Sequence, residues 1–469
     1  MAILRTVRAS IGDWIDRVGL ESPARLALAG FGLVILVFAG LLSLPQATQS
    51  GVRAPFIDAL FTATSAVCVT GLVTVDTGSY WSGFGQGAIL IAIKVGGLGI
   101  MTMASLLGLA VSRRIGLTQR ILAAGEARAS GLGDFRHLLR TIIIVSTATE
   151  LSIAFVLFWR LLAHHEHLPT ALWHAIFYGI SAFNNAGFSP DPNGIVPFAA
   201  DPWFRIPIAG GVFIGALGFP VYLNLIRAWR RPRSWSLHTK LTLVMVVLLS
   251  FISAALLAAF EWNNPDTLGA YHPFTRFGQT MFISINQRSG GFSAVDHGAM
   301  NEHTWLLEDV LMFIGGGSGG TAGGIRVTTV AVLILAIWAE ARGRRDMEAF
   351  GKRIGTEVLR LAVAVTIISL AFVIVGAGVI LAQTTGTVLP YRPDAVGLGL
   401  DEVLFEAISA YATCGLSTGI TSHLPADAKL TLTILMFVGR LGSVTIAASL
   451  ALNRQRRVIR YPSERPLIG

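Results

Sequence analysis

Charged residues are scarce in this 469-residue chain, at 13% of the total, whereas 53% of the residues are hydrophobic. Soluble globular domains carry charge on about a quarter of their residues, so this balance excludes an ordinary soluble domain. Apolar runs over 26–44, 142–157, 241–260 and 361–381 approach the ~20 residues that a helix needs to cross a bilayer. The chain is therefore predicted to be an integral membrane protein.

Cysteine is almost absent, with Cys68 and Cys414 the only two in the chain. Both lie inside copies of a repeat described below, which argues against a disulfide scaffold or a cysteine metal site. The apolar runs also lack paired acids and His-x-x-Glu or Ser/Lys constellations. We therefore expect neither enzymatic activity nor a covalently bound cofactor. The first 25 residues mix arginines with acids and do not resemble a cleaved signal peptide.

The net charge of +9 is distributed in a way that argues against nucleic-acid binding. Most of the 36 Lys and Arg residues fall in five segments between or beside the apolar runs. These segments are 1–25, 113–140, 227–240, 342–360 and 453–469. Basic residues flank membrane spans on the cytoplasmic side. The five segments, and with them both termini, are predicted to be cytoplasmic and to lie beside the lipid bilayer.

One motif, F-x-x-x-S-A-x-x-x-x-G-[LF], occurs three times without a gap. The copies are FTATSAVCVTGL at 61–72, FYGISAFNNAGF at 177–188 and FEAISAYATCGL at 405–416. A looser copy, MFISINQRSGGF, occupies 281–292. The terminal glycines lie about a quarter of the chain apart, at Gly71, Gly187, Gly291 and Gly415. The chain is therefore predicted to consist of four copies of one unit.

Each copy lies on a short helix between two long apolar spans. The predicted units are 26–126, 127–235, 236–350 and 351–453, with a cytoplasmic N-terminus at 1–25 and a cytoplasmic C-terminus at 454–469. The short helices, expected near 54–67, 170–183, 273–287 and 400–412, are too short to span a bilayer, which suggests re-entrant segments. The fold predicted is an all-α integral membrane protein with four pseudo-symmetric helix–pore helix–helix repeats around one central pore.

The glycine after each short helix has a physical reason. Non-helical backbone at bilayer depth must be buried in protein or line water. Glycine adopts φ > 0 without steric cost, and a backbone of alternating handedness turns successive carbonyls toward one side. Four such segments around an axis can replace the hydration shell of a monovalent cation. The alternative is that the glycines only cap amphipathic helices.

These patterns resemble the Trk/Ktr/HKT superfamily of potassium transporters over nearly the whole chain. The motifs that carry the resemblance are NQRSGGF at 286–292, NNAGFS at 184–189, GGLGIMT at 96–102, GGSGGTAGGIR at 316–326 and GRLGSVT at 439–445. Only one span precedes the first short helix, so the chain looks like a KtrB-type membrane subunit of a Ktr system. The resemblance implies potassium uptake across a bacterial plasma membrane.

The resemblance also implies a selectivity filter that binds K⁺ mainly through backbone groups. Its residues would be Val67, Cys68, Val69, Thr70, Gly71, Phe183, Asn184, Asn185, Ala186, Gly187, Gln287, Arg288, Ser289, Gly290, Gly291, Tyr411, Ala412, Thr413, Cys414 and Gly415. Some plant HKT members with serine at the first glycine position pass sodium, so the resemblance implies that glycine at all four positions favours potassium.

A glycine-rich loop interrupts the second span of the third unit. It consists of Gly315, Gly316, Gly317, Ser318, Gly319, Gly320, Thr321, Ala322, Gly323 and Gly324. A dinucleotide or phosphate loop needs a preceding strand or a Gly-Lys-[Ser/Thr] sequence, and neither is present. A loose kink and a broken helix beneath the filter remain as alternatives. The resemblance implies an intramembrane gating loop.

Arg440 lies inside the last apolar span, where a central arginine costs roughly 2.5–3.5 kcal/mol on insertion scales. The resemblance implies an electrostatic barrier to ions below the filter. Snorkelling, or a salt bridge to Glu406, is the structural alternative. Lys94 is a second charge within a span, and structural pairing is favoured for it. Arg288 is expected to orient its pore helix or to pair with a carboxylate.

The run from His164 to His167, with Glu166 in it, resembles a metal cluster but lacks a second group of ligands, so a metal site is not favoured there. The resemblance further implies a homodimer and a separate cytoplasmic ring of the KtrA or KtrC type. Any nucleotide is expected on that partner. A secondary active solute transporter with broken helices is the alternative function.

Overall fold

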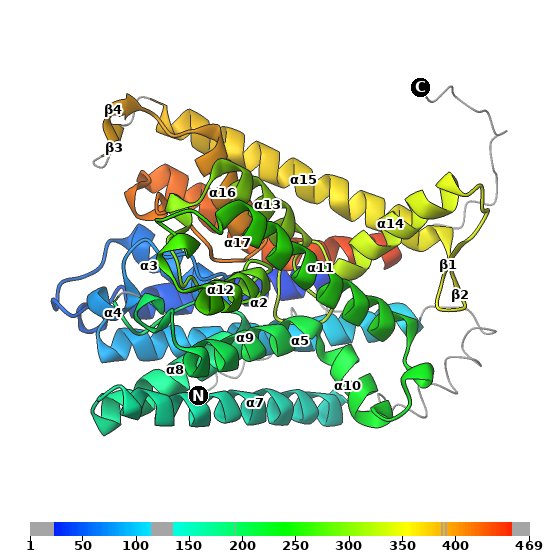
Figure 1. Ribbon diagram of the computed structural model, residues 1–469, viewed down its shortest axis with the longest axis horizontal. Helices are drawn as coiled ribbons and strands as arrows, with labels where there is room; N and C mark the ends of the chain where they lie inside the picture. Colours follow the sequence, from blue (N-terminus) through cyan, green and yellow to red (C-terminus); the bar gives the residue numbers. More distant parts are fainter. Residues whose placement is uncertain (1–22, 114–134, 193, 386–387, 390–391, 453–469) are drawn as a thin grey trace, which may run out of the picture.

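The computed structural model describes residues 23–113, 135–192, 194–385, 388–389 and 392–452 (Figure 1). The predicted C-terminal segment 454–469, nearly all of the N-terminal segment 1–25 and most of the basic segment 113–140 lie outside the described residues. The described chain is predominantly helical. Two short antiparallel hairpins add β1 (Met347–Ala349) with β2 (Lys352–Ile354), and β3 (Val388–Leu389) with β4 (Arg392–Val396).

The helices follow the predicted order of span, short helix and span four times. The first unit contains α2 (Pro23–Leu42), α3 (Phe56–Val67), the single-turn α4 (Thr77–Tyr80) and α5 (Gly83–Arg113); the second contains α7 (Phe135–Ala163), α8 (Leu168–Asn184), α9 (Pro202–Leu217) and α10 (Phe219–Ala228). The third contains α11 (Leu237–Glu261), α12 (Pro273–Asn286), α13 (Glu302–Ile314) and α14 (Val327–Ala341); the fourth contains α15 (Thr356–Thr384), α16 (Leu400–Tyr411) and α17 (Ala426–Leu452).

The ends of the molecule differ in what they carry. Figure 1 shows the long helices α5, α7, α11 and α15 extended along the molecule, with α10 and the β1–β2 hairpin at one end. Helix α10 is the last helix of unit 2 and the β1–β2 hairpin joins unit 3 to unit 4, whereas α4 and the β3–β4 hairpin, which lie inside units, are at the other end. The boundaries between units 2 and 3 and between units 3 and 4 therefore lie at the same end of the molecule.

Within the described residues, four helical segments are long and apolar enough to cross a bilayer: 83–102, 139–163, 237–261 and 356–384. Counted together as one span, the bent pair α9 and α10 adds a fifth. Helices α7 and α15 expose large apolar side chains, among them Phe155, Trp159 and Ile374. A contiguous apolar surface of this kind is unusual on a soluble protein and suits contact with hydrocarbon.

The four short helices begin where the sequence signals predict. Pro55 is the N-cap of α3, while Pro169 and Pro273 occupy the first positions of α8 and α12, where the missing N–H group costs no intrahelical bond. In α16, the carboxylates of Asp401 and Glu402 occupy the first turn, where they complement the positive end of the helix dipole.

The second apolar span of unit 2, over 203–226, is not one continuous helix. Helix α9 ends at Leu217 and α10 begins at Phe219, with a bend of 97° between them. Gly218 takes φ 92° and ψ 147°, which lies outside the helical region, and Pro220 lacks the N–H group that would continue the hydrogen-bond ladder. The second span of unit 3 is also interrupted, between Ile314 and Val327, at the predicted glycine-rich loop.

Candidate functional site

The four terminal glycines meet in a closed ring. A Cβ atom added to Gly71 would lie 3.3 Å from Gly187 Cα, and one added to Gly187 would lie 2.8 Å from Gly291 Cα. A Cβ on Gly291 would lie 2.7 Å from the Cys414 carbonyl oxygen, and one on Gly415 would lie 3.0 Å from Gly71 Cα. The ring therefore runs through the four units in chain order, and none of its members has room for a side chain.

Each ring glycine has a positive φ, and so does the residue two positions before it. The glycine values are 99° at Gly71, 69° at Gly187, 71° at Gly291 and 94° at Gly415. The preceding values are 55° at Val69, 59° at Asn185, 113° at Ser289 and 47° at Thr413. The conformation is costly for a side chain, above all a β-branched one. Positive φ therefore recurs at equivalent positions in all four units, which is the alternating backbone expected from the glycines. The residues two positions before the glycines were not predicted to share this conformation.

The serine of the repeated motif supports this backbone. Its hydroxyl accepts the N–H of the ring glycine in two units, from Gly71 to Ser65 Oγ at 3.0 Å and from Gly415 to Ser409 Oγ at 3.1 Å. In the second unit, Ser181 instead donates to the Phe188 carbonyl at 2.8 Å.

The third copy has Ile285 at the serine position and uses different contacts. The Gly290 N–H group donates to the Asn286 carbonyl at 2.6 Å. We call residues 67–71, 183–187, 287–291 and 411–415, each of which ends at a ring glycine, the four ring segments. Ser289 Oγ donates to the Thr413 carbonyl at 3.1 Å, which ties the third ring segment directly to the fourth. The weaker sequence signature of this copy therefore reflects another way of holding the same backbone.

Glycines of the second spans allow those spans to pack against the first residue of three ring segments. An added Cβ at Gly96 would strike the Val67 carbonyl oxygen, and one at Gly439 would strike that of Tyr411. An added Cβ at Gly215 of α9 would likewise strike the Phe183 carbonyl oxygen. The glycine motifs in α5 and α17 are thus explained by close backbone approach.

The loop 315–324 packs directly beneath the ring and into the break of α9. The N–H groups of Gly317 and Thr321 donate to the carbonyls of Ala216 and Gly215, at 2.8 and 3.2 Å. Thr321 Oγ1 lies 3.3 Å from the Phe183 carbonyl oxygen, and the Gly323 N–H group donates to Ser289 Oγ at 3.0 Å. Since the loop is hydrogen-bonded to two ring segments and to α9, it is an ordered segment and not a loose kink.

Arg440 joins the loop to the fourth ring segment. It is 1% exposed, and its Nη1 donates to the Thr321 carbonyl and lies 3.3 Å from Thr413 Oγ1. Its Nε and Nη2 atoms are buried without a protein hydrogen-bond partner. The salt bridge to Glu406 that the sequence left open is not formed, because that carboxylate accepts from Ser417 Oγ and Thr421 Oγ1.

Arg326, which the sequence analysis did not select, is a second buried cation in this region. Its Nη1 donates to the carbonyls of Gly317, at 3.3 Å, and of Ala322, so it holds the loop closed on itself. Arg326 lies two residues after Gly324, the last glycine of the run, and is the N-cap residue of α14. An arginine just beyond a glycine run within a span was the available signal.

The comparisons with known proteins identify the family of this chain. A model of the family described as TrkH, cation transport protein, matches residues 33–459. The chain belongs to the TrkH family of cation transport proteins. It is 35% identical over 448 residues to Ktr system potassium uptake protein B of Bacillus subtilis, which covers 96% of this chain and 97% of that protein. Potassium/sodium uptake protein NtpJ of Enterococcus hirae is 32% identical over 456 residues, 96% of this chain and 97% of that protein.

A solved structure gives the same fold. The crystal structure of the potassium transporter TrkH from Vibrio parahaemolyticus matches with a TM-score of 0.66 and 18% identity, over 91% of this chain and 85% of that one. The expected membership of the Trk/Ktr/HKT superfamily is thus confirmed, and so is the mostly helical, multi-pass membrane fold. Membrane cation transport, the activity of the TrkH family, is not an enzyme activity.

Two charged residues near the ring of this TrkH-family chain have partners in the protein. Lys94 Nζ lies 2.6 Å from Glu150 Oε2, which is the structural pairing favoured from the sequence. Arg288 points to α11, where its Nη1 donates to the Val246 carbonyl at 3.1 Å and its Nη2 to Ser250 Oγ at 2.5 Å. Arg288 therefore contributes only backbone to the ring and braces the third segment against α11.

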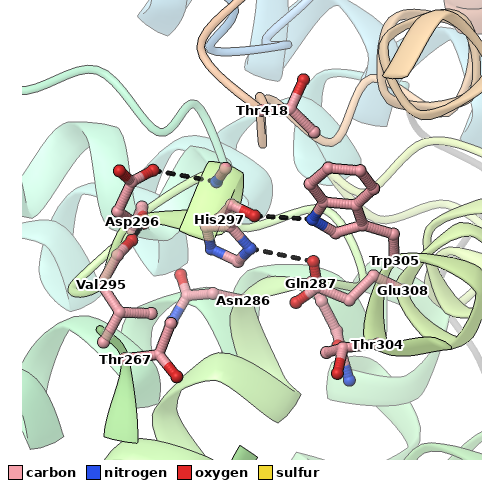
Figure 2. A network of polar contacts seen from close by, with 12 residues as sticks. Thr267, Asn286, Gln287, Val295, Asp296, His297, Thr304, Trp305, Glu308 and Thr418 are labelled. Carbon is pink, nitrogen blue, oxygen red and sulfur yellow. Dashed lines mark hydrogen bonds and ion pairs between the residues drawn. The ribbon is translucent and has the colours of Figure 1, made fainter. Parts of the chain in front are cut away.

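A buried network outside the third ring segment was not predicted. His297 Nδ1 lies 2.9 Å from Glu308 Oε2, and Trp305 Nε1 donates to the His297 carbonyl at 2.6 Å (Figure 2). Figure 2 shows Gln287 of the third ring segment beside these residues. Burial lowers the pKa of His297, but the carboxylates of Glu308, Asp296 and Glu261 together raise it above its ordinary value, and Glu308 contributes most of the three. The network joins the chain after the third segment to α13.

The histidine run after α7 does not act as one cluster. His164 Nε2 lies 3.1 Å from Asp201 Oδ2, and that carboxylate also accepts a hydrogen bond from Arg160. Glu166 turns instead toward His174 and Asp191, which are distant in sequence. The side chains closest to Glu166 in this cluster therefore come from α8 and from the chain after the second ring segment.

Proposed function

We propose that this chain is the ion-translocating subunit of a potassium uptake system and that the ring of four glycine segments is its selectivity filter. The observation that carries the proposal is the alternation of positive φ at both the glycine and the residue two before it, in all four units. Backbone of this kind presents carbonyl oxygens that can replace the hydration shell of K⁺.

The surroundings of the ring support a cation. The four short helices α3, α8, α12 and α16 end immediately before the ring segments, so the negative ends of their dipoles lie next to the ring. The B. subtilis relative is named a potassium uptake protein, and the E. hirae relative a potassium/sodium uptake protein. Glycine at all four ring positions favours potassium as the preferred ion of this chain.

We propose that loop 315–324, together with Arg440, gates the pore beneath the filter. The loop touches the second and third ring segments, and Arg440 bridges the loop to the fourth. A guanidinium group in this buried region opposes the passage of a cation by charge repulsion, while the glycines let the loop change conformation without steric cost. Displacement of the loop would move Arg440 and open the path.

The same proposal places both termini and the unit connections in the cytoplasm of a bacterial cell, with unit boundaries at 26–126, 127–235, 236–350 and 351–453. The Ktr system names of relatives support a chain that works with other subunits. We propose a homodimer that docks on a cytoplasmic ring of the KtrA or KtrC type. Nucleotide would bind to that ring and not to this chain.

Broken helices also occur in secondary transporters, which place their substrate at the break. Here the two breaks, at Gly218 and at 315–324, pack against each other through the Phe219 N–H and the Gly319 carbonyl, at 3.1 Å. Because protein fills both breaks, a filter at the ring is the better supported proposal.

The test is uptake of rubidium, as a potassium tracer, into a bacterium that lacks its own potassium transporters, with a Ktr-type ring subunit co-expressed. We expect growth rescue at low potassium and uptake that potassium competes away more strongly than sodium does. Absence of rescue from a chain that is present in the membrane would overturn the proposal. Uptake of an organic solute without rubidium flux would favour the solute transporter.

A further inference from the structure

Three side chains that could ligate a metal converge at the end of the molecule from which the short helices enter. Glu166 lies in the turn between α7 and α8, His174 lies on α8, and Asp191 lies four residues beyond the ring glycine Gly187. One ligand atom from each comes within 4.8 Å of the other two. The set thus joins three separate segments of unit 2.

The distances match those of a coordination shell. His174 Nδ1 lies 3.3 Å from Glu166 Oε2 and 3.5 Å from Asp191 Oδ1. Ligands bound tetrahedrally at ~2.0–2.1 Å from Zn²⁺ are separated from each other by roughly 3.4 Å. Two carboxylate oxygens therefore already flank one imidazole nitrogen at nearly the spacing that a shared cation requires.

The hydrogen bonding leaves these atoms available. His174 Nδ1 and Glu166 Oε2 are both buried and have no hydrogen-bond partner. Buried polar atoms without partners are uncommon in folded proteins and call for an unseen water, ion or functional role. The three side chains are 15–19% exposed, so the cluster lies close to the surface although these two atoms are covered.

A second layer of contacts orients the ligands. The Tyr178 hydroxyl on α8 donates to Asp191 Oδ2 at 2.6 Å, which leaves Oδ1 directed at His174. The backbone of 190–192 is packed so closely against Gly78 of α4 that a Cβ there would lie 2.6 Å from Pro192 N. Such supporting hydrogen bonds and packing hold ligands in place before the metal binds.

From this geometry we infer that Glu166, His174 and Asp191 form a binding site for a divalent transition-metal cation, of which Zn²⁺ is the test ion. One imidazole and two carboxylates with a further position open to water is a ligand set that zinc accepts. The metal would fasten the chain leaving the second ring segment to α8 and to the α7–α8 turn. Its placement on the external face follows from the orientation in the proposed function, whereas binding itself does not depend on that proposal.

The experiment is a calorimetric titration of Zn²⁺ into the purified full-length chain in detergent, prepared metal-free with an affinity tag that contains no histidine. We expect saturable binding at a single site per chain that weakens as the pH is lowered, because metal and protons compete for the ligands. His174→Gln and Asp191→Asn are nearly isosteric and should each abolish this binding. His303→Ala removes an exposed histidine at the start of α13 and should leave it unchanged.

Tyr178→Phe keeps the aromatic ring but removes the hydroxyl that orients Asp191, and it should weaken zinc binding by about 10–100-fold. Size-exclusion profiles like that of the unsubstituted chain will show that each variant is folded. Absence of saturable binding, or binding that survives both His174→Gln and Asp191→Asn, would overturn the inference and leave an ion pair of His174 with the two acids. Because the readout is binding, failure of this site and failure of potassium uptake are separate results.

Discussion

Lys94 of α5 and Glu150 of α7 form an ion pair between the first and second units, with Nζ 2.6 Å from Oε2. The same carboxylate accepts a hydrogen bond from Asn184 Nδ2 at 2.9 Å through its other oxygen. Asn184 belongs to the second ring segment, so one buried acid connects two spans to the ring. The neighbouring Gly97 allows this approach, since a Cβ there would strike the Asn184 amide.

Breaking this pair from one side should be costly. Lys94→Met leaves Glu150 buried with an uncompensated charge, and loss of one partner of a buried pair costs about 3–5 kcal/mol. We expect a lower melting temperature for Lys94→Met and for Glu150→Leu, and partial recovery in the double variant, where both charges are gone. Lys240→Met, a substitution in a predicted cytoplasmic segment, serves as the matched control. Additive losses in the double variant would show that the two residues do not depend on each other.

Gly71→Ser should weaken the preference for potassium over sodium. Gly71 has φ 99°, and an added Cβ would lie 2.5 Å from the Ala186 carbonyl oxygen of the next ring segment. The carbonyl must therefore move, and carbonyl placement sets the discrimination between dehydrated cations. We expect at least about a tenfold fall in the selectivity ratio, or ~1.4 kcal/mol, measured by rubidium uptake under sodium competition.

The control for this substitution is Gly51→Ser. Gly51 also has a positive φ, 70°, but an added Cβ there meets nothing within 4 Å. Strain in the backbone is thus present in both variants, whereas only Gly71→Ser disturbs the ring. Unchanged selectivity in a folded, membrane-inserted Gly71→Ser protein would count against the ring as the filter.

Local signals were sufficient to predict the repeated architecture. Three short helices start at or next to a proline, the fourth starts with two acids, and a glycine follows each of them. These residues lie close in sequence to the helix ends that they determine. The break at Gly218 also had a local signal, because Pro220 follows two residues later. It was missed because the run 203–226 is apolar throughout most of its length, and hydropathy does not distinguish a bent span from a straight one.

Contacts between units could not be predicted in the same way. Val69 and Thr413 are β-branched, and nothing in their neighbouring sequence favours a positive φ. The conformation is imposed by closure of the ring across the four units. The pairing of Lys94 with Glu150 likewise depends on how helices pack, and so does that of Glu166 with His174 and Asp191. The sequence therefore identifies these charged residues but not their partners.

Arg440→Ala should increase cation flux. The guanidinium lies buried beneath the ring, with two nitrogens that have no protein partner, and it joins Thr321 of the loop to Thr413 of the ring. Alanine removes both the positive charge and the link to the loop. We expect about a tenfold higher rate of rubidium efflux from proteoliposomes without a ring subunit, equivalent to ~1.4 kcal/mol of barrier.

Arg440→Lys retains the charge and should keep the flux low, which separates the electrostatic effect from the loss of packing. Deleting several residues of loop 315–324 should also raise flux without any ligand. Flux of Arg440→Ala equal to that of the unsubstituted chain would argue against a barrier. Loss of the folded size-exclusion peak in Arg440→Ala would instead show a structural role.

The His297–Glu308 pair should make stability depend on pH in a defined direction. The pKa of His297 is raised in the folded protein, because burial lowers it by less than the carboxylates of Glu308, Asp296 and Glu261 together raise it. A histidine whose folded pKa is raised stabilises the fold fully below its unfolded pKa, and this contribution is lost as the pH rises through the folded value. We therefore expect the stabilisation to disappear on the alkaline side of the ordinary histidine pKa of about 6.5.

The measurement is the melting temperature of the purified chain between about pH 6 and about pH 9, a range that brackets histidine titration. The unsubstituted protein should lose more stability across this range than His297→Gln, which cannot titrate but fills a similar volume. Glu308→Gln should show the same reduced dependence, because the neutral amide no longer favours the imidazolium. His167→Gln changes an exposed histidine at the N-cap of α8, in another unit, and should follow the unsubstituted protein. Parallel curves for the unsubstituted protein and His297→Gln would show that the pair does not titrate in this range, and that His297 acts only as a packed hydrogen-bonding group behind the third ring segment.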